Sequence, residues 1–69
     1  GAGRSVLDLG CGSAEPIAGF FIDAGCQVTG VDAATAMLEL CRARYPGQEW
    51  IAADMRGLDL GRRFDAVIA

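Results

Sequence analysis

The sequence predicts an α/β fold with a parallel sheet, because short apolar runs typical of buried strands alternate with segments of helical periodicity. Strands are expected at 5–9, 27–32, 49–53 and 64–69, with helices between the first three of them. The connection at 54–63 is polar, contains glycine and has room for no more than one helical turn. Crossovers between successive parallel strands follow one hand, so both helices should cover the same face of the sheet.

The first helix is expected to start beside Ser13, which can cap it, and to include Pro16 in its first turn. Gly25 is its natural stop, since glycine readily takes the left-handed conformation that ends many helices. Four apolar residues have the i, i+3, i+4, i+7 spacing of an inward helical face: Ile17, Phe20, Phe21 and Ala24.

The second helix is expected to be capped by Thr35 and to end at Pro46-Gly47. Glu39 lies near its start and arginines lie near its end, in the arrangement that the helix dipole favours. Its inward face is predicted to consist of Met37, Leu38, Cys41 and Tyr45.

The composition narrows the functions that the chain can perform. Its 69 residues make at most one small domain, and its net charge of −3 argues against non-specific nucleic-acid binding. No apolar run is long enough to span a membrane and no signal-peptide pattern opens the sequence, so a cytoplasmic location is expected. The chain contains neither histidine nor lysine, so it offers no imidazole base and no Schiff-base nucleophile.

The three cysteines, Cys11, Cys26 and Cys41, lie far apart in the sequence and form no Cys-x-x-Cys pair. No metal site is therefore expected, and all three cysteines are predicted to stay reduced. Cys26 and Cys41 are interpreted as small apolar residues that pack in the core.

Acidic residues accompany the carboxyl ends of three predicted strands: Asp8, Asp32 and Asp54. Ligands of open parallel sheets bind at this edge. Gly10 and Gly12 follow the first strand and permit a sharp turn with a close approach of a ligand to the backbone. The carboxylate at the mouth of this loop would repel a pyrophosphate and attract a ligand with an ammonium and a sulfonium group. The pattern therefore predicts a site for a cationic nucleoside derivative.

Each of these residues also has a purely structural interpretation. Asp32 is placed to bind both hydroxyls of a ribose, or it is a solvated loop acid or helix cap. Asp54 can accept from an adenine amino group while the Met55 backbone N–H donates to the ring, or it is a loop acid before a turn. Met37 can pack on an adenine face or belong to the core. The arginines of the connection are expected on a solvated surface: Arg56, Arg62 and Arg63.

In order and spacing, five motifs closely resemble the class I S-adenosylmethionine-dependent methyltransferases, and they span nearly the whole chain. The resemblance implies a Rossmann-like parallel sheet, of which about four strands and two helices are present here. Residues 1–69 would form the N-terminal, cofactor-binding part of one larger methyltransferase domain, without its C-terminal half. The motifs are Val6-Leu7-Asp8-Leu9-Gly10-Cys11-Gly12, Val28-Thr29-Gly30-Val31-Asp32, Met37-Leu38, Ala53-Asp54-Met55 and Phe64-Asp65-Ala66-Val67-Ile68-Ala69.

The resemblance also implies the cofactor, S-adenosylmethionine, and the residues that bind it. The first strand and its loop would face the methionine part of the cofactor, and Asp32 would hold the ribose. The stretch from Ala33 to Met37 would line the adenine, and Asp54 with Met55 would read the adenine edge. The positions that match the family's cofactor contacts are Asp8, Gly10, Cys11, Gly12, Asp32, Ala33, Met37, Asp54 and Met55.

The implied reaction is an in-line displacement at the sulfonium methyl, to which the protein contributes mainly alignment. The methyl acceptor is expected to be a small molecule. Any base that activates it would follow Ala69, so no catalytic residue is assigned, and the 69-residue segment is expected to be inactive by itself.

Two other classes of protein stay open at this point. A Rossmann segment of an NAD(P)-dependent oxidoreductase would share the glycine loop and Asp32, but Asp8 and Glu15 disfavour a pyrophosphate there. The other is a non-catalytic, truncated module. Parallel sheets are normally covered on both faces, and 64–69 is an apolar edge strand. We therefore expect the segment to need the rest of a larger domain and to self-associate without it, and a homo-oligomer is left open.

Overall fold

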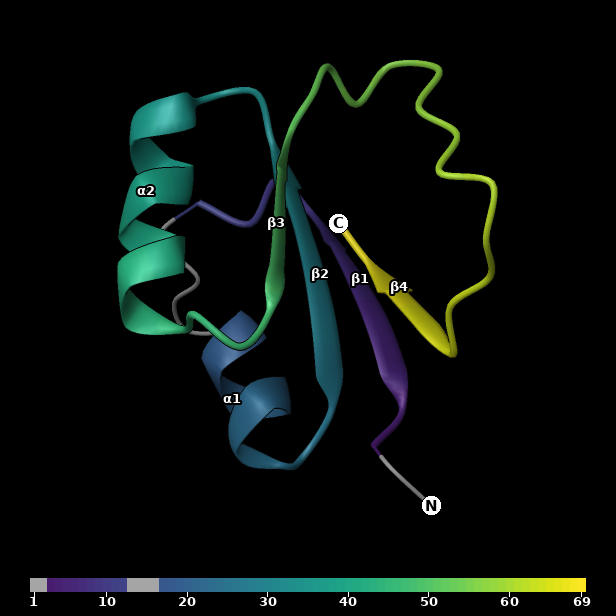
Figure 1. Cartoon of the computed structure of the whole chain (residues 1–69). Helices are drawn as coiled ribbons and strands as arrows, with labels where there is room; N and C mark the ends of the chain where they lie inside the picture. Colours follow the sequence, from purple (N-terminus) through teal and green to yellow (C-terminus); the bar gives the residue numbers. More distant parts are fainter. Residues whose placement is uncertain (1–2, 13–16) are drawn as a thin grey trace.

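The computed structural model describes residues 3–12 and 17–69. A four-stranded sheet in the order β3-β2-β1-β4 has every neighbouring pair parallel, and two helices lie together on one of its faces (Figure 1). The predicted α/β class and the shared helix face are thereby confirmed. No helix in the described part of the chain is long and apolar enough to cross a membrane. The elements are β1 (Ser5–Leu9), α1 (Ile17–Asp23), β2 (Gln27–Asp32), α2 (Thr35–Arg44), β3 (Glu49–Ala52) and β4 (Ala66–Ile68).

The strand order reverses next to β1. From β1 the chain steps outward to β2 and β3, and it then returns to place β4 on the opposite side of β1. Asp8 on β1 is consequently in register with Gly30 on one side and with Ile68 on the other. In open α/β sheets, ligands bind beyond the carboxyl ends of the strands at such a reversal.

Helix α1 ends where its glycine predicts. Gly25 has a φ of 89° and its N–H donates to the Ile22 carbonyl at 3.0 Å, while the Cys26 N–H donates to the Phe21 carbonyl at 2.9 Å. These two bonds form a Schellman motif, which satisfies carbonyls that the helix leaves unpaired. The start predicted from Ser13 and Pro16 lies outside the described residues.

The predicted inward face of α1 was wrong for three of its four residues, since only Phe21 packs against the core. Phe20 is 68 % exposed and Ile17 is 50 % exposed, whereas Ala18 and Gly19 are buried. The two small residues let the helix approach the sheet closely, and the larger Phe21 and Ile22 pack only partly against the core. The helix is thus rotated by about one residue relative to the spacing of its largest side chains.

Helix α2 agrees better with its prediction. Leu38 and Cys41 are fully buried, and Met37 and Tyr45 are half-buried. Thr35 is not the cap, however, because the helix begins at that residue and Ala34 occupies the cap position without a side-chain hydrogen bond.

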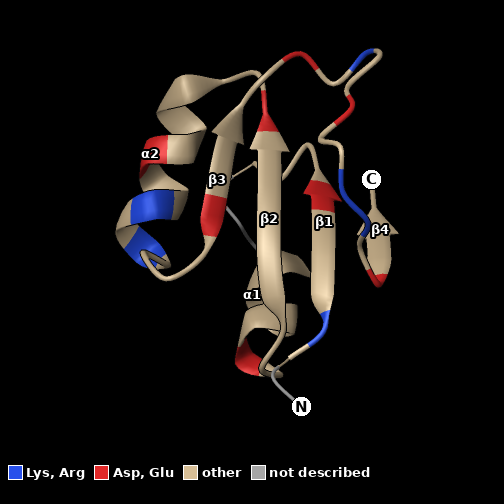
Figure 2. Ribbon diagram, turned by 45° about the vertical axis from the view of Figure 1, so that its right-hand side comes forward, with Lys and Arg blue, Asp and Glu red and all other residues tan. Residues whose placement is uncertain are grey.

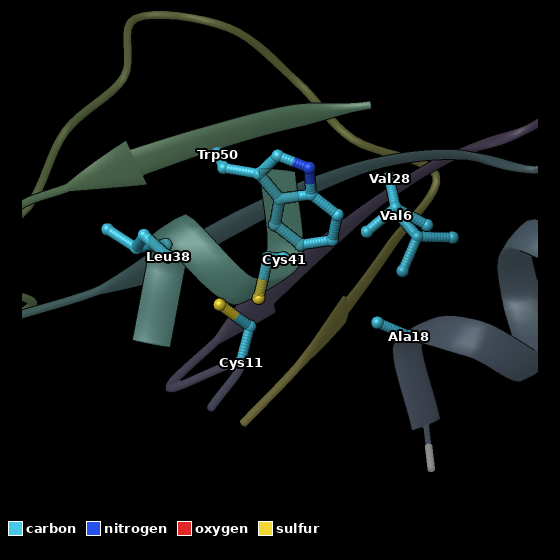
Figure 3. Close-up of a cluster of buried hydrophobic side chains, with 7 residues drawn as sticks. All are labelled: Val6, Cys11, Ala18, Val28, Leu38, Cys41 and Trp50. Carbon is cyan, nitrogen blue, oxygen red and sulfur yellow. The ribbon is translucent and has the colours of Figure 1, made fainter. Parts of the chain in front are cut away.

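The core lies between the helices and the sheet (Figure 3). Trp50 of β3 crosses Gly30 of β2 so closely that a Cβ at Gly30 would collide with the indole ring. A glycine in the middle of this strand is therefore a packing requirement. The buried apolar residues are Val6, Cys11, Ala18, Val28, Leu38, Cys41 and Trp50.

The last two strands are shorter than predicted, since β3 ends at Ala52 and β4 covers only Ala66–Ile68. The connection between them is tied to the face of the sheet opposite the helices. Arg62 forms an ion pair with Glu49 of β3, and its guanidinium lies 5.1 Å from the centre of the Phe64 ring. Arg62 is exposed, as expected, and it also anchors the connection to the sheet.

Candidate functional site

Acidic residues lie at the carboxyl edge of the sheet, at the ends of β1 and β2 and just after β3 (Figure 2). Their environments differ. Asp8 is buried with 7 % exposure, Asp32 is partly exposed, and Asp54 is exposed. The three carboxylates at this edge therefore range from buried to exposed.

Asp8 lies on the side of β1 that faces the helices, as Val6 does. Burial raises the pKa of its carboxyl above 3.8, and the charge of Asp32 raises it further. A cation placed beside this carboxylate would reverse that effect, because an opposite charge favours the ionised form. A cation beside Asp8 would thus favour the ionised form of its carboxyl.

The loop after β1 uses its own N–H groups within the protein. Gly10 and Gly12 have φ values of 75° and 57°, which favour glycine. The N–H groups of Gly10 and Cys11 donate to the Val31 carbonyl at 2.7 and 3.3 Å, and the Gly12 N–H donates to Asp32 Oδ2 at 3.0 Å. A loop that cradles phosphate presents such donors to the ligand. This loop is consequently not arranged for a pyrophosphate.

A cavity of about 160 Å³ opens where the strand order reverses. It combines one buried carboxylate with backbone and apolar side chains, which suits a small cationic group on an aliphatic chain. A larger open depression, of about 800 Å³, lies at the opposite edge near Gln27 and Gln48, away from the three acids. The smaller cavity is lined by Asp8, Leu9, Gly10, Cys11, Ile17, Ala18, Ile68 and Ala69.

Asp32 holds the loop and the start of α2 together. Besides the Gly12 bond, its Oδ1 accepts a hydrogen bond from the Ala34 N–H at 2.9 Å. The Ala34 and Gly12 N–H groups lower the pKa of this carboxyl, which therefore stays ionised at neutral pH. Each carboxylate oxygen can accept a second hydrogen bond. Asp32 can thus hold the loop and still receive two hydroxyl donors.

Asp54 is held by Arg56, two residues later. Its oxygens accept from the Arg56 N–H at 2.9 Å and from the guanidinium NH2 at 2.9 Å. The guanidinium lowers the pKa of Asp54, with a further contribution from the backbone N–H. Arg56 is on the surface, as expected, but its pairing with Asp54 was not predicted. The spacing of an acid and an arginine two residues apart could have indicated it.

Met55 meets the glycine loop through its side chain. A Cβ built on Gly10 would lie 3.8 Å from Met55 Cε and 3.9 Å from its sulfur. Met37 is half-buried and does not belong to the core cluster, and Ala33 is exposed. The structure therefore joins the loop to Asp32 by a hydrogen bond and places Asp8 in the cavity beside the loop, with the Met55 side chain near Gly10, while the adenine contacts stay predictions.

Cys11 is part of the loop and of the core at once. Its side chain is only 6 % exposed, and burial, followed by the charge of Cys41, raises the pKa of the thiol to about 12. The thiol stays protonated at neutral pH, so it is no nucleophile. All three cysteines are free, as predicted.

Comparison with known proteins gives a consistent result. The family described as "Methyltransferase domain" matches residues 6–69. The chain is 39% identical over 62 residues to malonyl-[acyl-carrier protein] O-methyltransferase of Pseudescherichia vulneris, covering 88% of this chain and 24% of that protein. It is 44% identical over 57 residues to trans-aconitate 2-methyltransferase of Paracidovorax citrulli strain AAC00-1, covering 78% of this chain and 21% of that protein. The chain thus spans about a quarter or less of these relatives.

Solved structures agree with the sequences. The amino pentose methyltransferase CalS10 of Micromonospora echinaspora, determined with S-adenosylmethionine bound, superimposes with a TM-score of 0.79 at 41% identity. The match covers 94% of this chain and 27% of that one. The oxidoreductase alternative is thereby set aside, and the chain belongs to the family of class I S-adenosylmethionine-dependent methyltransferases.

Proposed function

We propose that this chain supplies the S-adenosylmethionine site of an enzyme that methylates a small molecule. Residues 1–69 would be the N-terminal part of one methyltransferase domain, whose remainder contributes the acceptor site. Two observations support this division: the chain spans about a quarter of its relatives, and Val67 on the edge strand β4 is 59 % exposed. Because edge strands of this kind invite pairing, a further strand beside β4 would complete the sheet.

The cavity at the strand reversal carries the proposal. Its buried carboxylate, Asp8, would face the cationic methionine part of the cofactor, and the loop with positive φ at Gly10 and Gly12 leaves the backbone accessible. Asp32, already ionised, would accept the ribose hydroxyls. The remaining contacts would come from Ala33 and Met37 beside the adenine and from Asp54 with Met55 at its edge. These donor and acceptor groups fit the cofactor.

The cofactor would supply a methyl group on a positively charged sulfur. This chain would bind and orient it, and Asp8 would provide the complementary charge. No described residue is placed to activate an acceptor, so catalytic assignments belong to the rest of the proposed domain. A small-molecule acceptor is supported by the printed names of the relatives, two of which act on trans-aconitate and on an amino pentose. A cytoplasmic location is proposed with it.

The test is a calorimetric titration of S-adenosylhomocysteine into the protein that carries this chain together with the rest of its proposed domain. We expect one site per chain, and NADH titrated under the same conditions should give no heat of binding. Saturable binding of NADH without binding of S-adenosylhomocysteine would contradict the proposal.

A further inference from the structure

Gly12 is held through both of its backbone polar groups. Its N–H donates to Asp32 Oδ2 at 3.0 Å, and its carbonyl accepts from the Cys41 thiol with Sγ 3.0 Å from the oxygen. Cys41 belongs to α2 and lies 29 residues from Gly12 in the sequence. Figure 3 shows the Cys41 and Cys11 sulfur atoms close together. The loop is therefore tied to α2 by a side chain that the cofactor assignment does not use.

A hydrogen-bond donor is needed at this place. Cys41 is fully buried among Leu38, Trp50 and the other core residues, so the Gly12 carbonyl meets an apolar surface there. This contact is partly buried, where a carbonyl without a partner is costly, and an aliphatic side chain at position 41 would fill the space without providing a donor. The thiol does both, because it is apolar enough for the core and still carries a donor.

The thiol also keeps its proton. Burial is the largest contribution to the raised pKa of Cys41, and the charges of Asp32 and Asp8 add to it, while the hydrogen bond with Cys11 opposes it. A protonated thiol at neutral pH is the form that donates to a carbonyl. The bond to Gly12 is thus maintained under ordinary conditions.

We propose that Cys41 is a positioning residue for the cofactor, because its thiol holds the Gly12 carbonyl and so keeps the loop in the shape that the cofactor binds. The inference rests on the proposed function. Asp32 fixes the N–H of the same residue, so the loop would be ordered before the ligand arrives. A site that is ordered in advance loses less entropy on binding and therefore binds more tightly.

Two substitutions separate positioning from packing. Cys41→Val keeps an apolar side chain of similar size and removes the donor, whereas Cys41→Ser keeps a donor and removes apolar character. Loss of one hydrogen bond predicts that the valine variant binds S-adenosylhomocysteine about threefold to tenfold more weakly, with the serine variant within about twofold of the parent. If Cys41 only packs, the order is reversed: valine binds like the parent and serine binds more weakly.

Cys26 provides the matched control. It is half-buried at the edge of the same core and lies at the other end of the sheet, next to Gly25. Cys26→Val and Cys26→Ser should leave the affinity unchanged. Thermal melting of each variant establishes that it is folded at the temperature of titration, and Cys41→Ala replaces the valine variant if that one does not fold.

Amide hydrogen exchange of Gly12 in the cofactor-free protein gives a second, independent measure. The valine variant should exchange this amide faster than the parent and the serine variant should not, because loss of the donor at the Gly12 carbonyl loosens the loop that presents the Gly12 N–H to Asp32. Equal exchange in all three proteins would overturn the role of Cys41. If the parent itself does not bind S-adenosylhomocysteine, the proposed function fails, and the exchange rates still decide whether Cys41 holds the loop.

Discussion

The predicted cofactor contacts fall into two regions that are built differently. In the region of β1 and β2, Gly12 is bonded to residues 20 and 29 positions away, and Asp8 is buried beneath the same loop. In the connection after β3, Asp54 is bonded to Arg56, two positions away, and both side chains are largely exposed. The first region is held by bonds to residues distant in the sequence, whereas the second is held only by a bond between near neighbours.

This difference predicts how the two regions respond to change. A residue fixed by distant partners keeps its position until one of those partners is lost, so substitutions there should have large effects on binding. An exposed ion pair contributes little and can rearrange around a ligand. The β1–β2 region should therefore determine the affinity for the cofactor, and the connection should refine it.

The largest effect is expected from Asp32→Ala. This substitution removes the acceptor for the ribose together with the partners of the Gly12 and Ala34 N–H groups. We expect a loss of about 1–3 kcal/mol in the free energy of S-adenosylhomocysteine binding, the range for a charged hydrogen-bond partner. Calorimetry measures it, with Asp23→Ala, an exposed acid at the end of α1, as the control. An unchanged affinity would contradict the claim that the β1–β2 region determines the affinity for the cofactor.

A smaller loss is expected from Asp8→Asn, which keeps the shape of the side chain and removes its charge. Binding of the cationic cofactor should weaken by about 1–2 kcal/mol, while the neutral adenosine should bind with nearly the same affinity as to the parent. Titration of both ligands into both proteins measures the difference. Equal losses for the two ligands would show that Asp8 acts by shape and not by charge.

The pH dependence of stability tests the same carboxyl without a ligand. The folded pKa of Asp8 lies above the unfolded value of 3.8, so the folded state takes up a proton first on acidification. The cost of the buried charge is fully present above the folded pKa and disappears as the pH falls towards 3.8. Denaturant unfolding should therefore show that the advantage of Asp8→Asn over the parent shrinks in this window. An advantage that grows on acidification would contradict the direction of the shift.

The sequence predicted those parts of the fold that depend on neighbouring residues. Gly25 marks the end of α1 because its left-handed turn is a local property, and the strands were found from short apolar runs. The face of α1 was mispredicted because Ala18 and Gly19 pack closely, whatever the spacing of the phenylalanines. The Cys41–Gly12 bond was missed because its partners, 29 residues apart, meet only when α2 packs on the sheet. The proposed site residues were chosen from motifs and stay predictions, whereas their hydrogen-bond partners required the structure.

The smallest effect is expected from Arg56→Ala, which frees the Asp54 carboxylate. Arg56 is 91 % exposed in its side chain, so its ion pair is well screened and stability should not change measurably. If Asp54 accepts from the adenine amino group, the freed carboxylate becomes a better acceptor, and the affinity for S-adenosylhomocysteine should rise by no more than about twofold. In an Asp54→Ala background, adding Arg56→Ala should give no such gain in affinity. Calorimetry of the parent, the two single variants and the double variant measures this. A large loss on Arg56→Ala would instead place the arginine itself on the ligand, and the connection would then resemble the β1–β2 region in its importance for binding.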